Sequence, residues 1–187
     1  MITEEIKEKN FEIYIKKLGQ IEVNLDSLIE QGLNLKDASF TNSNEHGNAY
    51  PGSLLEIVLK VLTPYAVKLN ELLPENMRVD KNTLVKVCLL HHIAKAVRLV
   101  PNDNQWEVEK RQLVYKYAEC QPSIRTGLHS LILAQQAGVS FTPEEAEVMT
   151  VNDRDLTDDQ ARWHSSVMAT IVREANELTY IQINNNE

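Results

Sequence analysis

The feature that most constrains this 187-residue chain is the apolar stretch from Leu84 to Val97. Its density of apolar residues predicts a helix buried at the centre of the molecule. Two adjacent histidines, His91 and His92, lie within this stretch, and Lys95 follows them. Because buried polar side chains need partners, these residues indicate a site as well as a core.

Capping residues, apolar spacing and stops at glycine or proline predict that most of the chain is helical. The expected helices cover residues 3–19, 24–32, 53–74, 80–101, 123–137, a segment that starts at 142, and 157–182. Ser53 with Glu56 predicts a capping box, and Thr142 with Glu145 predicts another N-terminal cap. Pro64 should kink its helix because proline has no amide hydrogen.

Two segments do not follow the helical pattern. Residues 34–52 are rich in Asn and Gly, which predicts a surface loop. Trp106 and Val108 alternate with charged residues, as do the apolar residues near Tyr115 and Tyr117, which favours a small β-hairpin over 106–117. A helix in the same place is the competing interpretation.

Composition limits the classes of function. With 43% hydrophobic and 25% charged residues, the chain is typical of one globular domain. A net charge of −8 argues against nucleic-acid and membrane partners, and no basic recognition helix supports a helix-turn-helix. The N-terminal residues lack the apolar run of a signal peptide, so we expect a cytoplasmic protein. Cys88 and Cys120 indicate no disulfide framework.

The string CLLHHIAKA resembles the central motif of the HD-domain superfamily of metal-dependent phosphohydrolases, which has aspartate at the second position of the pair. The likeness continues from about residue 34 to 182, through HGNAYPGSLLEI, LLHHIAKAVRLVPND, YKYAECQPS, FTPEEAEVM and VREANEL. It implies an all-α, HD-domain-like helical bundle over residues 34–182. N-terminal helices in residues 1–33 should pack on this body, and residues 183–187 should form a frayed tail.

The resemblance also assigns positions in the family's metal site. His91 matches a ligating histidine, and Lys95 matches the lysine that follows the pair. The other positions have changed: Ile57 stands for a histidine, His92 and Asn176 stand for aspartates, and Thr126 and Asn152 stand where members with two metals have further histidines.

These replacements predict a cleft without a catalytic residue, a metal or another cofactor. Isoleucine offers no lone pair, and a divalent ion needs anionic oxygen to balance its charge. We therefore expect a non-catalytic HD-like domain with a structural or binding role. Its ligand would be a nucleotide or another phosphorylated small molecule in the residual cleft. A flap formed by Trp106 and the segment Tyr115–Tyr117 should cover it.

The alternative is an active phosphohydrolase with a rebuilt, atypical metal site. His91, His92, His129 and Asp153 would form that site. A zinc version would use His91 and His92 with Cys88, and either His129 or His164 as a further ligand. Metal in the purified protein would discriminate between the two hypotheses. The sequence is also compatible with a homo-oligomer.

Overall fold

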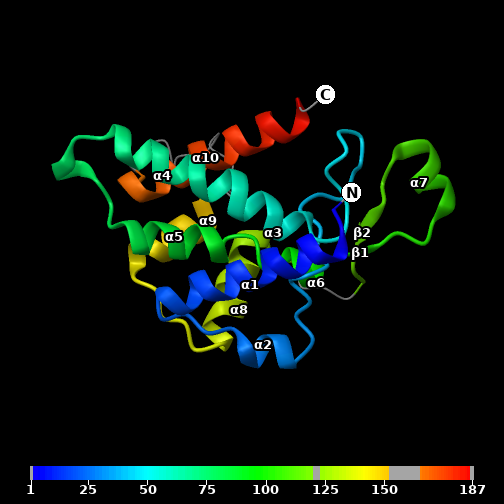
Figure 1. Cartoon of the computed structure of the whole chain (residues 1–187), viewed down its shortest axis with the longest axis horizontal. Coiled ribbons are helices and arrows are strands. Elements are labelled where there is room, and N and C mark those ends of the chain that lie inside the picture. The colour runs from blue at the N-terminus through cyan, green and yellow to red at the C-terminus, as the bar shows by residue number, and fades with distance from the viewer. Residues whose placement is uncertain (1, 120–122, 152–164, 186–187) are drawn as a thin grey trace.

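The computed structural model describes residues 2–119, 123–151 and 165–185. Over these ranges the chain is mostly helical with one two-stranded hairpin, which confirms the all-α prediction (Figure 1). The elements are α1 (Glu4–Gln20), α2 (Asp26–Glu30), α3 (Ser53–Ile57), the π-helix η1 (Val58–Leu62), α4 (Thr63–Leu72), the 3-10 helix η2 (Glu75–Met77), α5 (Lys81–Leu90), α6 (Lys95–Arg98), β1 (Leu99–Pro101), α7 (Gln105–Arg111), β2 (Tyr115–Tyr117), α8 (Thr126–Gln136), α9 (Pro143–Val151) and α10 (Val167–Asn184).

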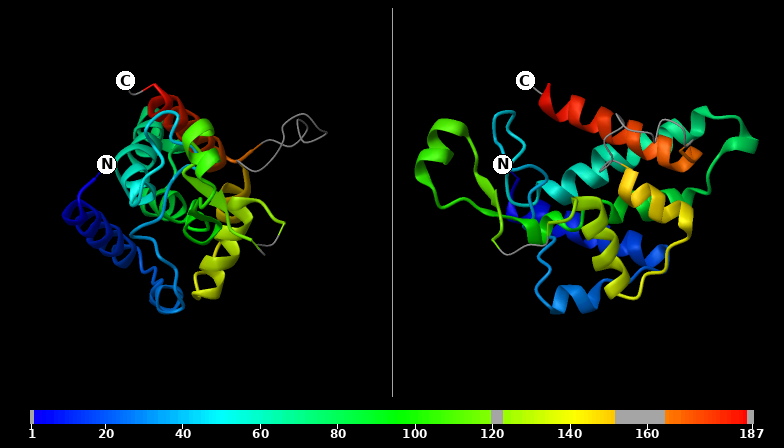
Figure 2. Two further views of the ribbon diagram at one scale, coloured as in Figure 1. Left: turned by 90° about the vertical axis from the view of Figure 1, so that its right-hand side faces the viewer. Right: turned by 180° about the vertical axis from the view of Figure 1, so that it is seen from behind.

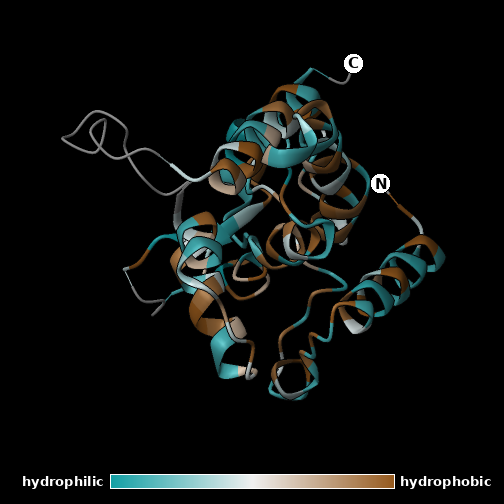
Figure 3. Cartoon of the chain, turned by 90° about the vertical axis from the view of Figure 1, so that its left-hand side faces the viewer, coloured by the Kyte–Doolittle hydropathy of each residue, from teal (hydrophilic) through white to brown (hydrophobic). Residues whose placement is uncertain are grey.

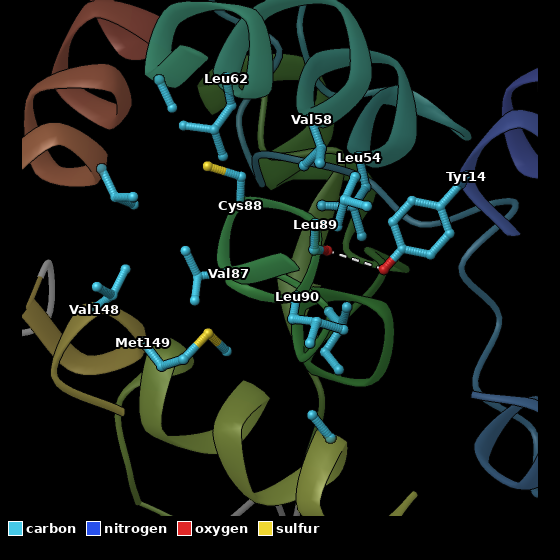
Figure 4. Close-up of a cluster of buried hydrophobic side chains, with 14 of the residues drawn as sticks. Tyr14, Leu54, Val58, Leu62, Val87, Cys88, Leu89, Leu90, Val148 and Met149 are labelled. Carbon is cyan, nitrogen blue, oxygen red and sulfur yellow. Dashed lines mark hydrogen bonds between the residues drawn. The ribbon is translucent and has the colours of Figure 1, made fainter. Parts of the chain in front are cut away.

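Helix α5 is the centre of the packing, as its apolar sequence predicts. It contacts α1, α4, α8, α9 and α10. Val87, Cys88, Leu89 and Leu90 on this helix are almost fully buried. Figure 4 shows these side chains between apolar residues of α3 and η1 on one side and of α9 on the other. Helix α5 therefore packs against neighbours on most of its surface, which explains why its sequence shows only weak amphipathic periodicity.

The N-terminal helices share this core. Tyr14 of α1 is fully buried, and its hydroxyl donates a 2.9 Å hydrogen bond to the carbonyl of Leu89 (Figure 4). Apolar and polar residues mix along α1, as expected of a helix with one buried stripe (Figure 3). In Figure 2 α1 lies along the side of the body, and its contacts with α3 and α5 attach it there.

Helix α5 ends earlier than the sequence predicts. It stops at Leu90, residues 91–94 form turns, and α6 begins at Lys95. The amides of Ile93, Ala96 and Val97 bond to carbonyls three residues earlier, which tightens the chain here. The prediction of one helix to Pro101 is therefore wrong, and the break lies at the two histidines.

The helix starts are partly as predicted. Asp80 caps α5 by accepting the amide of Thr83. Thr142 and Glu145 form a capping box, with each side chain accepting the other's backbone amide. The capping box at Ser53 is wrong, because Gly52 occupies the N-cap in the left-handed conformation. The Ser53 hydroxyl instead accepts the backbone amide of Phe40 at 2.9 Å, which anchors the preceding loop.

The helix that contains Pro64 is not interrupted. The π-helix η1 precedes the proline, and α4 continues directly from it. A proline cannot donate to the carbonyl four residues before it, and its ring crowds that carbonyl. A π-turn at this point is the local widening that accommodates both effects.

The segment after α6 contains both structures that its sequence allows. Strand β1 pairs antiparallel with β2, with Leu99 opposite Tyr117, and α7 lies between the strands. This arm projects from the helical body in Figures 1 and 2. Trp106 is on α7 and Tyr115 on β2, so the hairpin is confirmed for the tyrosines while the tryptophan is helical.

The last helix extends beyond its predicted end. Ile183 belongs to α10, is 2% exposed, and accepts a hydrogen bond from Asn48, so the chain is ordered to at least this residue instead of fraying from 183. The predicted start at Thr157 lies outside the described residues, as does Cys120. No helix in the described ranges has the length and apolar character needed to cross a membrane.

Candidate functional site

A cleft of about 380 Å³ opens where α5 gives way to α6. The loop before α3, the hairpin, the start of α8 and the middle of α10 form its other walls. It is lined by Phe40, Thr41, Asn42, His91, His92, Lys95, Arg98, Leu99, Tyr117, Thr126, Gly127, Asn176, Glu177 and Tyr180. The break in the central helix therefore exposes its polar residues to a cavity.

Lys95 is the most unusual residue of the cleft. It is only 9% exposed, and its ammonium donates to the Phe40 carbonyl at 2.8 Å and to the Tyr180 hydroxyl at 3.2 Å. The same nitrogen lies 3.6 Å from the centroid of the Phe40 ring. No carboxylate of the described residues forms an ion pair with it. Within the described part of the chain, this buried cation is thus held by dipoles and a ring face and not by a carboxylate.

Arg98 adds a second positive charge one helical turn later. Its Nη1 donates a 2.7 Å hydrogen bond to the Ile124 carbonyl, and its guanidinium lies 5.9 Å from the Tyr117 ring centroid. Its buried Nε has no hydrogen-bond partner within the described part of the chain. Glu177 is the carboxylate among the described lining residues, so the cleft carries more positive than negative charge.

The histidines of the site are neutral. Burial, with a smaller effect of the Lys95 charge, lowers the pKa of His91 to about 4. Burial also lowers the pKa of His92 well below its usual value, and Lys95 and His91 add to this effect. His129 lies nearby in α8, and burial and Arg98 lower its pKa too. Protonating any of these rings would add charge to a site that is already cationic.

Asn176 connects α10 to the histidine pair. Its side-chain oxygen Oδ1 lies 3.0 Å from Nε2 of His92. The His92 ring makes edge-to-face contacts with two further rings. Its centroid lies 5.0 Å from that of the Phe40 ring and 4.5 Å from that of the His91 ring. These contacts hold the imidazole in one orientation, in the way that buried polar networks usually do.

The structure brings most of the predicted site residues together. His91, His92, Lys95, Thr126 and Asn176 all line the cleft. Ile57 does not. It is 4% exposed and belongs to the main apolar core, so it is a packing residue instead of a cleft residue. Asn152 lies outside the described residues.

Sequence reasoning missed several residues of the cleft, above all Phe40, Arg98 and Tyr180. Two of them carry a signal in their spacing, because Arg98 follows Lys95 by three residues and Tyr180 follows Asn176 by four. Such residues lie on the same face of a helix. Phe40 carries no such signal, since it lies in an irregular loop and reaches Lys95 only through the fold.

The predicted flap is only partly at the cleft. Tyr117 lines the cavity and is 61% exposed. Trp106 is also 61% exposed but is not among the lining residues, because α7 carries it away along the projecting arm (Figure 1). The aromatic rings that contact Lys95 are those of Phe40 and Tyr180.

The described residues of the cleft do not provide a ligand group for a divalent metal. Nowhere in residues 2–119, 123–151 and 165–185 do three His, Cys, Asp or Glu side chains gather as a ligand group. Cys88 is fully buried in the apolar core, and the ammonium of Lys95 places a positive charge in the same cleft as His91 and His92. Asp153, which belongs to the rebuilt-site hypothesis, and His164, an optional ligand of its zinc version, lie outside the described residues.

Comparison of the chain with protein-family models, with curated proteins and with solved structures finds no match. The function therefore has to be inferred from the side chains of the cleft.

Proposed function

We propose that this protein is a non-catalytic, HD-like helical domain whose cleft binds a phosphorylated small molecule, such as a nucleotide, without hydrolysing it. The observation that carries the proposal is Lys95, a buried ammonium without a carboxylate partner among the described residues. A buried charge is costly unless another charge or strong dipoles compensate it. An anionic ligand would supply the missing counter-charge.

Three neighbours of Lys95 support a phosphate ligand. Arg98 places a guanidinium in the same cleft, and guanidinium groups match phosphate oxygens in geometry and charge. Thr126 and Gly127 begin α8, whose N-cap residue provides no side-chain cap. The positive end of a helix dipole adds to the attraction for an anion.

The dimensions of the cleft support a small ligand. Its volume of about 380 Å³ falls within the range of small-molecule sites. The Tyr117 and Tyr180 rings give it apolar faces, and Asn42, Thr41 and Asn176 provide polar groups. A phosphate with an attached ring or sugar would use both kinds of surface.

Binding can be tested by isothermal titration and thermal shift with inorganic phosphate, nucleoside monophosphates and sugar phosphates. We expect at least one phosphorylated compound to stabilise the protein and its parent alcohol or nucleoside to have little effect. Lys95→Met should remove the stabilisation, because it deletes the charge and keeps the length of the side chain. Lys68→Met, on an exposed position of α4, is the matched control.

The outcomes separate the hypotheses. Flat responses at millimolar concentration of every compound would support a purely structural role for the fold. A response that survives Lys95→Met would place the ligand elsewhere. Phosphate release that depends on added metal would instead favour the rebuilt-site phosphohydrolase.

The free thiol of Cys88 suits a reducing compartment, which agrees with our proposal of a cytoplasmic protein.

A further inference from the structure

The hydrogen bond between His92 and Asn176 determines which tautomer the imidazole adopts. An amide oxygen can only accept a hydrogen bond, so Nε2 of His92 must carry the hydrogen that it shares with Oδ1 of Asn176 at 3.0 Å. Because the ring is neutral, Nδ1 of His92 then has no hydrogen. The contacts of this ring with Phe40 and His91 prevent it from turning over freely.

This bond also orients the amide of Asn176. With Oδ1 facing His92, the Nδ2 group of the same side chain must face away from the ring. Asn176 is 6% exposed and lines the cleft, and its Nδ2 makes no hydrogen bond to any described residue. Two N–H donors on a buried side chain are thus available to a ligand.

Lys95 offers a donor beside them. Its ammonium has three hydrogens, of which the Phe40 carbonyl and the Tyr180 hydroxyl take two. Tyr180 follows Asn176 by one turn of α10, so the lysine and the amide lie on the same part of the cleft wall. Protein acceptors hold the Lys95 ammonium, and the His92 donor holds the Asn176 amide. Both groups have further N–H donors to present to the cavity.

We propose that His92 is a positioning residue, which holds the Asn176 amide so that its Nδ2 and the Lys95 ammonium form a donor pair for one anionic oxygen group of the ligand. The inference rests on the proposed function and deepens it. It implies that the group bound here is an acceptor, such as a phosphoryl oxygen. Ligands that end in an amine or amide hydrogen should be rejected, because they would leave the buried donors unpaired.

Two substitutions test the role of His92. His92→Phe keeps a ring between Phe40 and His91 but removes the donor, and we expect the Kd for the phosphorylated probe to rise about 10-fold or more. His92→Gln keeps a donor that can reach the amide oxygen and should restore most of the affinity. If the Phe and Gln variants bound equally well, the positioning role would be excluded. Asn176→Asp, which replaces Nδ2 by oxygen, should weaken binding about 10- to 100-fold.

A spectroscopic measurement tests the orientation without any ligand. Long-range proton–nitrogen correlation spectra distinguish the Nε2–H and Nδ1–H tautomers, and the His92 signals can be assigned by their loss in His92→Phe. We expect the Nε2–H tautomer. An Nδ1–H tautomer would overturn the inference, since His92 could then only accept at Nε2 and the amide would be reversed. This result is independent of whether inorganic phosphate or a nucleotide binds, so a failure of the proposed function remains distinguishable.

Discussion

The ammonium of Lys95 lies 3.6 Å from the centroid of the Phe40 ring and donates a hydrogen bond to the carbonyl of the same residue. One loop residue therefore stabilises the lysine twice, through its ring quadrupole and through its backbone dipole. These interactions offset part of the cost of burying a cation. They leave its net charge available to an anion.

This relationship predicts that Lys95→Met does not destabilise the ligand-free protein. Burying an ammonium without a carboxylate is costly, and a methionine of similar length fills the same space. We expect the free energy of unfolding, measured by urea denaturation, to stay equal or to rise by about 1 kcal/mol while phosphate binding is lost.

Lys86→Met provides the opposite case. Lys86 forms a 2.8 Å ion pair with Glu145, which is 5% exposed, so its removal leaves a buried carboxylate without its positively charged partner. This variant should lose about 2 kcal/mol or more of the free energy of unfolding. If Lys95→Met were the more destabilising of the two, the lysine would be a structural residue.

The contact between Tyr14 and Leu89 predicts a second stability effect. Leu89 lies in the last turn of α5, where carbonyls lose their helical partners, and the Tyr14 hydroxyl satisfies this one. Tyr14→Phe should lower the free energy of unfolding by about 1 to 3 kcal/mol, because it leaves a buried carbonyl unpaired. Tyr65→Phe, whose hydroxyl bonds to the partly exposed Gln182, should cost less. Equal losses in urea denaturation would contradict this assignment.

Local sequence signals predicted the helices whose ends depend on neighbouring residues. Asp80 and the pair of Thr142 and Glu145 cap their helices as expected, since a cap needs only a side chain and an amide a few residues apart. Ser53 has the same local pattern but bonds to Phe40 instead. Its role is decided by a residue of another segment, which the local pattern does not contain.

The residues of the cleft also divide into those that the sequence could suggest and those that it could not. His91, His92, Lys95 and Asn176 line the cleft. They were predicted as site residues because polar side chains are unusual in an apolar helix or because of the resemblance to the HD-domain family. Ile57 packs in the apolar core, as expected of an isoleucine among Leu54 and Leu55, and the family resemblance alone suggested it for the cleft. Phe40 could not be found, since its contact with Lys95 joins residues far apart in the chain.

The buried histidines predict a pH dependence of stability. The pKa of His91 is lowered to about 4 in the folded protein, whereas an unfolded histidine titrates near its usual value of about 6.5. Between these values the unfolded state binds more protons, so the free energy of unfolding must fall as the pH is lowered. The loss of unfolding free energy due to His91 is negligible above pH 7 and reaches about 3 kcal/mol near pH 4.

This dependence can be measured by urea denaturation between pH 7 and 5, where ordinary carboxyl groups remain ionised. His91→Gln should reduce the slope, because glutamine does not titrate. His46→Gln, at an exposed position, is the matched control and should leave the slope as it is. A slope that His91→Gln does not change would show that other groups carry the effect.

The last prediction concerns metal and hydrolysis. The resemblance to the HD-domain family predicts a lost ligand at position 57, and Ile57 lies in the apolar core. The described lining of the cleft combines histidines of lowered pKa and two cationic side chains with Glu177 as its carboxylate. Ile57→His alone should therefore restore neither metal binding nor turnover. We expect the purified protein, prepared without chelator, to contain less than stoichiometric divalent metal by elemental analysis.

The matching assay adds manganese, nickel, cobalt, zinc or magnesium and follows phosphate release from nucleotides and a generic ester. We expect no turnover, because base catalysis by a histidine contributes only about 10²- to 10⁴-fold and phosphate-ester hydrolysis needs far more. The variant with His91→Ala and His92→Ala together is the control. Metal-dependent turnover that disappears in this control would replace the binding function with hydrolysis at a rebuilt site. Turnover that persists in it would instead reveal a contaminating enzyme.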